Sequence, residues 1–141
     1  WAELQAVRAV TGDRAVLRAA HFFGDNARVS KQAAALVEGR FPDFLELVRA
    51  SGVSSAMQLQ NLFSTADPHQ QAGGVTLALA DHLLAGRGAV RVHGGGFAGT
   101  IQAYVPVDRA EDFRAGVDAV LGAGSCAILH IRPAGGVVIA G

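Results

Sequence analysis

The sequence GAVRVHGGGFAGTIQAYV, residues 88–105, is the stretch that decides the fold of this chain of 141 residues. Apolar and polar residues alternate in Ala89–Val92 and again in Thr100–Val105, a pattern typical of strands with one buried face. The segment between the two runs is rich in glycine and contains Gly94, Gly95, Gly96 and Gly99. The stretch therefore predicts a β-hairpin with a glycine-rich connection.

Before this hairpin, apolar residues recur with helical spacing up to about residue 85. Asp13, after a glycine, is expected to cap a long second helix that ends at Gly39. Pro42 suits the first turn of a third helix, which is expected to stop near residues 51–52. The pair at residues 67–68, an aspartate and a proline, predicts the start of a fourth helix. The first part of the chain is thus expected to be helical.

After the hairpin, a helix capped by Asp108 is expected to bury Phe113, Val117, Val120 and Leu121. Two further apolar segments, Ser125–Ile131 and Val137–Ala140, are predicted to form a second strand pair around a proline- and glycine-containing turn. This order predicts one α+β domain over residues 1–141. Its helices would pack on one face of a mostly antiparallel four-stranded sheet, as in ferredoxin-like domains.

Charge and composition limit the classes of partner. The 12 basic and 12 acidic residues balance and form no runs, so neither nucleic acid nor an anionic membrane is an expected partner. No apolar stretch reaches the roughly 18 residues of a membrane span, and no signal peptide is recognisable. We expect a cytoplasmic protein. The high apolar content, 50%, and a first residue other than methionine suggest a piece of a longer protein.

The glycine-rich connection has two interpretations on its residues alone. Glycine admits positive φ and close backbone approach, so the loop could be a structural turn or could direct N–H groups towards a phosphate. It lacks the Gly-Lys-Ser/Thr ending of a P-loop. It also precedes a strand rather than the helix of a dinucleotide-binding motif. Both interpretations stay open at this level.

The segment Gly88–Thr100 is similar to the third signature of galactokinases, which belong to a superfamily of kinases for galactose, homoserine, mevalonate and related metabolites. Further similarity lies in residues 21–29, 57–61 and 129–136, so the resemblance spans nearly the whole chain. It implies the C-terminal domain of an ATP-dependent sugar kinase. Galactose is the first expected substrate, and galactose 1-phosphate the product.

In such kinases the missing N-terminal domain would hold ATP, magnesium, the catalytic aspartate and most sugar contacts. The resemblance implies that this domain and the sugar are the partners of the present chain, and that the chain alone is inactive. It carries over no catalytic residue and no metal ligand. The residues that it implies as support for the nucleotide site are Gly94, Gly95, Gly96, Phe97, Ala98 and Gly99.

The chain departs from the family pattern at several positions. Ala98 replaces a usual glycine, His93 a usual threonine or serine, and Asp25 a usual glutamate. Residues 51–52 are Ser-Gly instead of the usual Ser-His. These differences leave the sugar open, with galacturonate, arabinose or an N-acetylated hexosamine as alternatives. A non-catalytic sensor of sugar and ATP and an autonomous ferredoxin-like binding module are alternative functions.

A second candidate site lies on the predicted long helix. His21, Asp25 and Arg28 fall on one helical face, which would be either solvated or in contact with the missing domain. The remaining polar candidates have ordinary interpretations. The other histidines are dispersed and predict no metal site, the serine pairs predict caps and turns rather than nucleophiles, and the one cysteine predicts a core position. These residues are His69, His82, His130, Ser54, Ser55, Ser64, Thr65 and Cys126.

Overall fold

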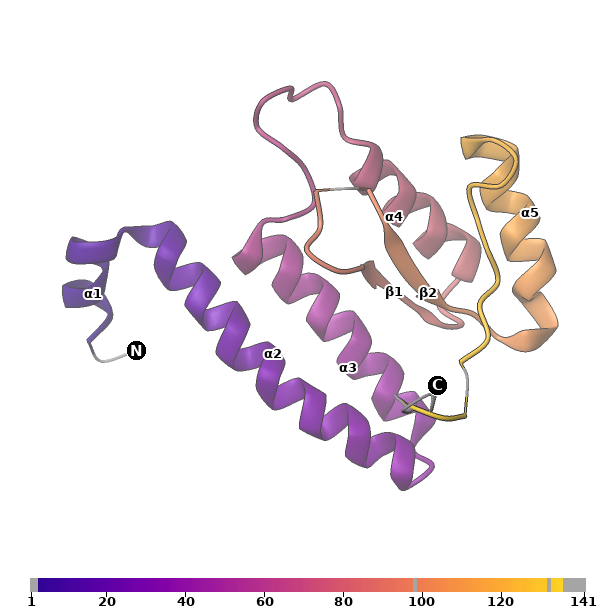
Figure 1. The fold of residues 1–141 in the computed structure, drawn as a ribbon, viewed down its shortest axis with the longest axis horizontal. Coiled ribbons are helices and arrows are strands. Elements are labelled where there is room, and N and C mark those ends of the chain that lie inside the picture. Colours follow the sequence, from indigo (N-terminus) through magenta and orange to yellow (C-terminus); the bar gives the residue numbers. More distant parts are fainter. Residues whose placement is uncertain (1–2, 98, 132, 136–141) are drawn as a thin grey trace, which may run out of the picture.

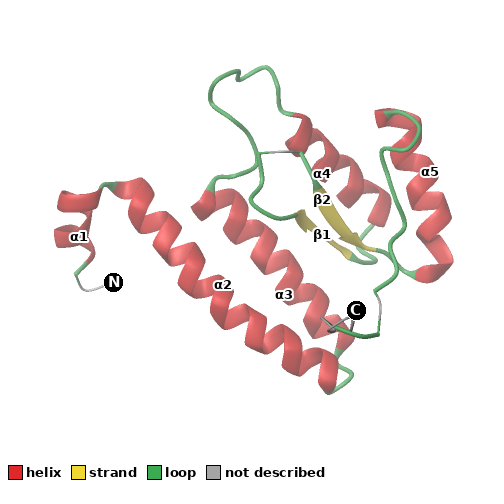
Figure 2. Cartoon of the chain, viewed as in Figure 1, coloured by secondary structure: helices red, strands yellow, loops and turns green. Residues whose placement is uncertain are grey.

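The computed structural model describes residues 3–97, 99–131 and 133–135, and the described part is mainly helical (Figure 1, Figure 2). Helices and one short hairpin follow one another along the chain. The elements are α1 (Leu4–Thr11), α2 (Asp13–Val37), α3 (Phe41–Ser54), a π-helical turn (Ser55–Leu59), α4 (Ala72–Leu84), β1 (Ala89–Val92), β2 (Ile101–Tyr104), a 3₁₀ turn (Val107–Arg109) and α5 (Ala110–Leu121).

The first three helices follow the predicted pattern closely. α2 begins at Asp13, although that side chain pairs with Arg8 instead of capping the helix. α2 ends two residues before Gly39, which has a φ of 69°. Pro42 lies in the first turn of α3, as expected. The positions of glycine and proline in the sequence therefore predicted where these helices begin and end.

The end of α3 and the start of α4 differ from the prediction. α3 continues through Gly52 to Ser54. Gly52 serves packing there, because a Cβ at this position would lie 3.2 Å from Arg91 Cβ and 3.3 Å from the Val90 carbonyl oxygen in β1. α4 begins at Ala72. Asp67 instead accepts a hydrogen bond from the His69 N–H at 3.0 Å and closes a turn within the preceding loop.

The predicted β-hairpin is confirmed. β1 and β2 are antiparallel, and the register places Ala89 opposite Tyr104 and Val92 opposite Ile101. One additional hydrogen bond, from the His93 N–H to the Thr100 carbonyl at 3.0 Å, extends the pairing to the start of the glycine-rich loop. The hairpin therefore fixes both ends of that loop.

Helices cover both faces of this hairpin. Successive residues of a strand point to opposite faces, and the two apolar clusters divide accordingly. Ala89 packs with α2 and α3, whereas Val90 packs with α4 and α5. In Figure 1 the two strands lie between α3 and α4. One cluster contains Ala35, Phe44, Val48 and Ala89, and the other contains Ala80, Leu84, Phe113 and Val117.

The predicted four-stranded sheet with helices on one face is wrong. Within the described residues there are two strands, and each of their faces carries helices. Ser125–Ile131 is irregular, and Leu129 and Ile131 are 85% and 91% exposed. β-branched residues stabilise a strand only beside a partner strand, which this segment lacks among the described residues. The predicted strand Val137–Ala140 lies outside the described residues.

The last helix is only partly as expected. Phe113 and Val117 are buried, but Val120 and Leu121 are 62% and 36% exposed. Asp108 does not cap α5 and instead pairs with Arg87 at 3.2 Å. Cys126 is partly buried against the second cluster, in agreement with its predicted core position, and burial raises the pKa of its thiol. No helix in the described ranges combines the length and apolarity that crossing a bilayer would demand.

Candidate functional site

The glycine-rich loop, residues 93–100, closes the hairpin and lies against the segment between α3 and α4. Gly94, Gly96 and Gly99 have φ values of 64°, 74° and 77°, which agrees with the conformational freedom expected of glycines in this loop. Phe97 also has a positive φ, 56°, without being a glycine. Ala98 lies outside the described residues, so its predicted role has no structural counterpart here.

Asn61 contacts this loop through both its main chain and its side chain. It was not predicted as a site residue. Its carbonyl oxygen accepts the Phe97 N–H at 2.8 Å, and its side-chain Nδ2 donates to the Gly95 carbonyl at 3.3 Å. Gly96 lies so close that a Cβ there would be 2.2 Å from the Asn61 carbonyl oxygen. The predicted loop residues Gly95, Gly96 and Phe97 therefore share one contact, the buried Asn61.

The start of α4 forms the neighbouring wall. A Cβ at Gly73, in the first turn of α4, would lie 2.9 Å from the Leu62 carbonyl oxygen and 4.0 Å from Gly99 Cα. Small residues here allow three backbone segments to approach one another. The loop is thus a close-packed backbone assembly with Gly94, Gly95 and Phe97 exposed.

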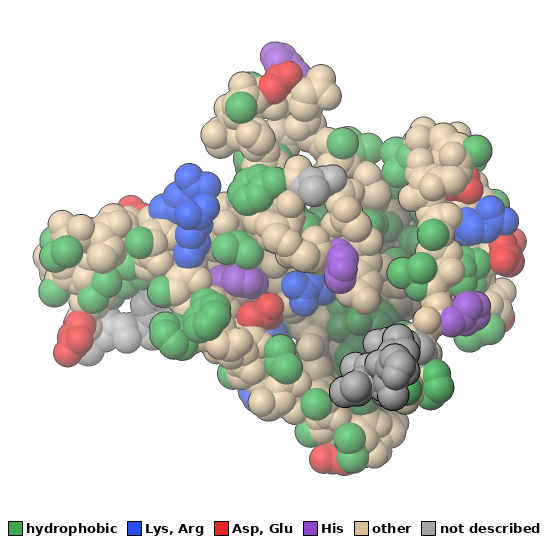
Figure 3. Space-filling model, in the orientation of Figure 1, with side chains coloured by type: hydrophobic (Ala, Val, Ile, Leu, Met, Phe, Trp, Pro, Cys, Tyr) green, Lys and Arg blue, Asp and Glu red, His purple; other side chains and the backbone are tan. Residues whose placement is uncertain are grey.

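The second candidate, the Asp25 cluster, lies where α2, α3 and β1 meet. It comprises the predicted residues His21, Asp25 and Arg28 together with Ser51, Ser54, Gln58 and Arg91. Figure 3 shows histidine, basic and acidic side chains close together in the middle of one face of the molecule, with apolar side chains beside them. The three predicted residues do share one helical face, and that face meets α3 and β1 of the same chain.

Asp25 is the central acceptor of this cluster. Ser51 Oγ donates to its Oδ1 at 2.6 Å, Arg28 Nη1 donates to the same oxygen at 3.0 Å, and Arg91 Nη2 lies 4.0 Å from Oδ2. Burial alone would raise the pKa of this carboxyl. The hydrogen bonds from Ser51 and Arg28 and the charge of Arg91 outweigh burial and hold the pKa below its usual range.

This lowered pKa predicts a loss of stability in acid. The ionised form of Asp25 is favoured by folding, so its contribution is complete above the unfolded pKa of about 3.9 and disappears as the pH falls through the lower folded value. Asp25→Asn is expected to flatten the dependence of the unfolding free energy on pH below about 4. Denaturant unfolding between pH 7 and 2.5 measures it. Asn26→Ala, beside Asp25 on the exposed side of α2, removes no titratable group and is the control that should leave the slope unchanged. Parallel curves for wild type and Asp25→Asn would contradict the assignment.

His21 and Ser54 form the other half of the cluster. Ser54 lies at the N-cap position of the π-helical turn, but its side chain makes no capping hydrogen bond there. His21 Nδ1 lies 2.9 Å from Ser54 Oγ, and His21 Nε2 lies 3.8 Å from Asp25 Oδ2. The order Ser-His-Asp resembles a hydrolytic triad. However, Ser54 is 4% exposed and its hydroxyl donates to Gln58 Oε1 at 2.9 Å. A hydroxyl that is buried and points away from its base is not a nucleophile.

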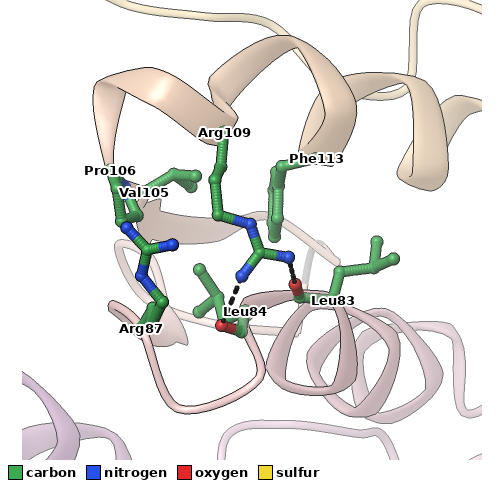
Figure 4. A pocket seen from close by; sticks show the side chains of 7 residues that line it. All are labelled: Leu83, Leu84, Arg87, Val105, Pro106, Arg109 and Phe113. Carbon is green, nitrogen blue, oxygen red and sulfur yellow. Dashed lines mark hydrogen bonds between the residues drawn. The ribbon is translucent and has the colours of Figure 1, made fainter.

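Two further hollows occur among the described residues. Figure 4 shows Arg109 reaching between α4 and α5, where its guanidinium donates to the Leu83 and Leu84 carbonyls at 3.0 and 3.3 Å. These bonds cap the C-terminus of α4, and the space around them does not admit a water molecule. An open groove of about 430 Å³ between α2 and the start of α3 is lined by Lys31, Ala34, Arg40, Asp43, Glu46 and Leu47, and within it Arg40 pairs with Asp43.

Side chains that could bind a metal ion do not form a cluster in the part of the chain that the structure describes. No three His, Cys, Asp or Glu side chains there come close enough together to hold an ion. The described residues therefore do not fit a magnesium site of carboxylate ligands.

Sequence reasoning missed Ser51, Ser54, Asn61 and Arg91. The usable signal was the presence of several serines on the apolar side of a helix, because serine is seldom buried without a polar partner. No family model and no solved structure matches this chain.

Proposed function

We propose that the chain is the C-terminal part of an ATP-dependent sugar kinase of the galactokinase type. The intact enzyme would transfer the γ-phosphoryl group of ATP to the anomeric hydroxyl of galactose. The phosphorus–oxygen bond to the β-phosphate breaks, a new one to the sugar oxygen forms, and the hydroxyl proton leaves to a base of the other domain. Because ATP is the donor, we place this reaction in the cytoplasm.

The observation that carries this proposal is the conformation of the glycine-rich loop. A simple hairpin turn needs no buried asparagine beneath it, whereas this loop is hydrogen-bonded to Asn61 at two points. A loop with a fixed backbone and exposed glycines can serve as a rigid wall that contacts the phosphate-binding loop of another domain and fixes its position. The resemblance of Gly88–Thr100 to a galactokinase signature gives that wall its proposed role.

We assign the groups that bind magnesium and neutralise the phosphate charge to the absent domain. Magnesium would neutralise the phosphate charge during transfer, and the described residues offer no cluster of carboxylates for it. Gly94, Gly95, Gly96, Phe97 and Gly99 support the nucleotide site through their backbone. None of them is a catalytic residue, so the chain by itself is expected to be inactive.

Exposed apolar side chains support a covering domain. Phe22 and Phe23 project from the helix that carries the Asp25 cluster, Met57 lies in the π-helical turn, and Phe97 lies in the loop, and each is more than half exposed. A second domain that packs over the loop and the Asp25 cluster would bury such side chains. Under this proposal His21, Asp25 and Arg28 orient the surface that faces it.

The test is a kinase assay on the protein that carries this chain. With ATP, Mg²⁺ and galactose we expect ADP and galactose 1-phosphate in equal amounts, detected by a coupled ADP assay and by ³¹P NMR. Galacturonate, arabinose and N-acetylgalactosamine are tested in parallel to define the sugar. The 141-residue chain alone is the negative control. Binding of sugar and ATP without turnover would indicate the sensor instead, and turnover by the isolated chain would overturn the proposal.

A further inference from the structure

Asn61 differs from the other buried polar residues of the chain in how it is placed. It lies in the segment between the π-helical turn and α4, and it is 1% exposed. The preceding residue, Gln60, has a φ of 57°, a left-handed conformation that a residue with a side chain seldom adopts. This turn directs Asn61 towards the glycine-rich loop, 34 residues further along the chain.

The contacts of Asn61 act on three consecutive loop residues. Its Nδ2 donates to the Gly95 carbonyl, its own carbonyl accepts the Phe97 N–H, and Gly96 fits between them only because it has no Cβ. Both its side chain and its main chain are used. A residue with such contacts determines where the middle of the loop lies relative to the end of α3.

Backbone strain is concentrated at the same place. Gln60 and Phe97 both have positive φ, and the hydrogen bond from the Phe97 N–H to Asn61 joins their two segments. Non-glycine residues keep such conformations only where surrounding contacts impose them. Phe97 therefore depends on its hydrogen bond to Asn61 for a conformation that a phenylalanine does not favour.

The side-chain Oδ1 of Asn61 is buried and has no hydrogen-bond partner among the described residues. A buried acceptor without a donor is unfavourable and uncommon, so the hydrogen bonds that Asn61 makes to the loop must offset this cost.

We propose that Asn61 is a positioning residue. It holds Gly95–Phe97 in the conformation that receives the phosphate-binding segment of the partner domain. The activity part of this inference rests on the proposed kinase function. The fixing of the loop by Asn61 does not.

Two measurements on the protein that carries this chain test the proposal. In Asn61→Ala, hydrogen exchange of the peptide covering residues 93–101 is expected to become about tenfold faster, while peptides from α3 and α5 keep their protection. In the kinase assay the KM for ATP is expected to rise about five- to tenfold, with kcat for saturating ATP changed much less. Asn26→Ala, on the exposed side of α2, is the matched control and should change neither.

A second variant guards against loss of folding. Asn61→Leu keeps the approximate size and branching of the side chain and the main-chain carbonyl, buries no charge, and has no group that donates to the Gly95 carbonyl, so the same faster exchange is expected. Unchanged exchange in both variants overturns the proposal. Faster exchange with unaltered KM and kcat overturns the positioning role. Faster exchange in a protein without kinase activity sustains the fixing of the loop by Asn61 and refutes the proposed function alone.

Discussion

Gly96→Ala is expected to lower kcat/KM for ATP about a hundredfold in the intact enzyme, the effect of a small misplacement of a positioning loop. The new Cβ would lie 2.2 Å from the Asn61 carbonyl oxygen and 2.6 Å from its Nδ2. Neither atom can retreat, because Asn61 is buried, and the φ of 74° at residue 96 is itself unfavourable for alanine. The loop must therefore move away from the end of α3.

Gly135→Ala is the control, because a Cβ at residue 135 meets no atom within 4 Å, its φ is not in the left-handed region and it lies outside the glycine-rich loop. We expect kcat/KM within about twofold of wild type, which is less than the effect of one hydrogen bond. Steady-state kinetics with ATP varied at saturating sugar measures both variants. Equal losses at residues 135 and 96 would show that the contact with Asn61 is not what the loop requires.

Gly88→Ala is expected to have the largest effect on stability, a loss of about 3 kcal/mol from steric overlap and a strained backbone together. Gly88 precedes β1, and its φ is 136°. A Cβ there would lie 2.3 Å from the Tyr104 carbonyl oxygen and 2.7 Å from Leu84 Cδ2. Relief of the overlap would separate the strands or push the end of α4 away from the hairpin.

Urea unfolding followed by circular dichroism measures this loss. The control is Gly74→Ala within α4, where a Cβ meets nothing within 4 Å. Alanine favours a helix over glycine, so this variant should be neutral or more stable by about 0.5 kcal/mol. Similar midpoints for Gly88→Ala and wild type would mean that the hairpin and α4 are not packed as described.

Local features of the fold were predictable, because they depend on residues close together in sequence. Glycine and proline marked the ends of α2 and the start of α3, and alternation marked β1 and β2. The second strand pair failed for a different reason. Ser125–Ile131 has the composition of a strand, but a strand also requires a neighbour, and composition does not reveal whether one is present.

The candidate site divides in the same way. The glycines at 94, 96 and 99 were identified because positive φ is a property of the residue itself. Asn61 was not, because its role depends on contacts with a loop more than 30 positions away. The same holds for Ser51, whose partner Asp25 is on another helix. Helical spacing predicted that Asp25 and Arg28 share one face of α2. It could not predict that α3 and β1 pack against this face.

The hairpin separates two apolar clusters, and this arrangement affects how the chain unfolds. Neighbouring residues of one strand, Ala89 and Val90, belong to different clusters, so the two helical layers are joined chiefly through a pair of four-residue strands. Substitutions confined to opposite layers, such as Val48→Ala and Val117→Ala, should change the unfolding free energy additively. Cooperativity between the layers then depends on the shortest regular elements in the chain, and weakening the hairpin would allow one layer to melt before the other.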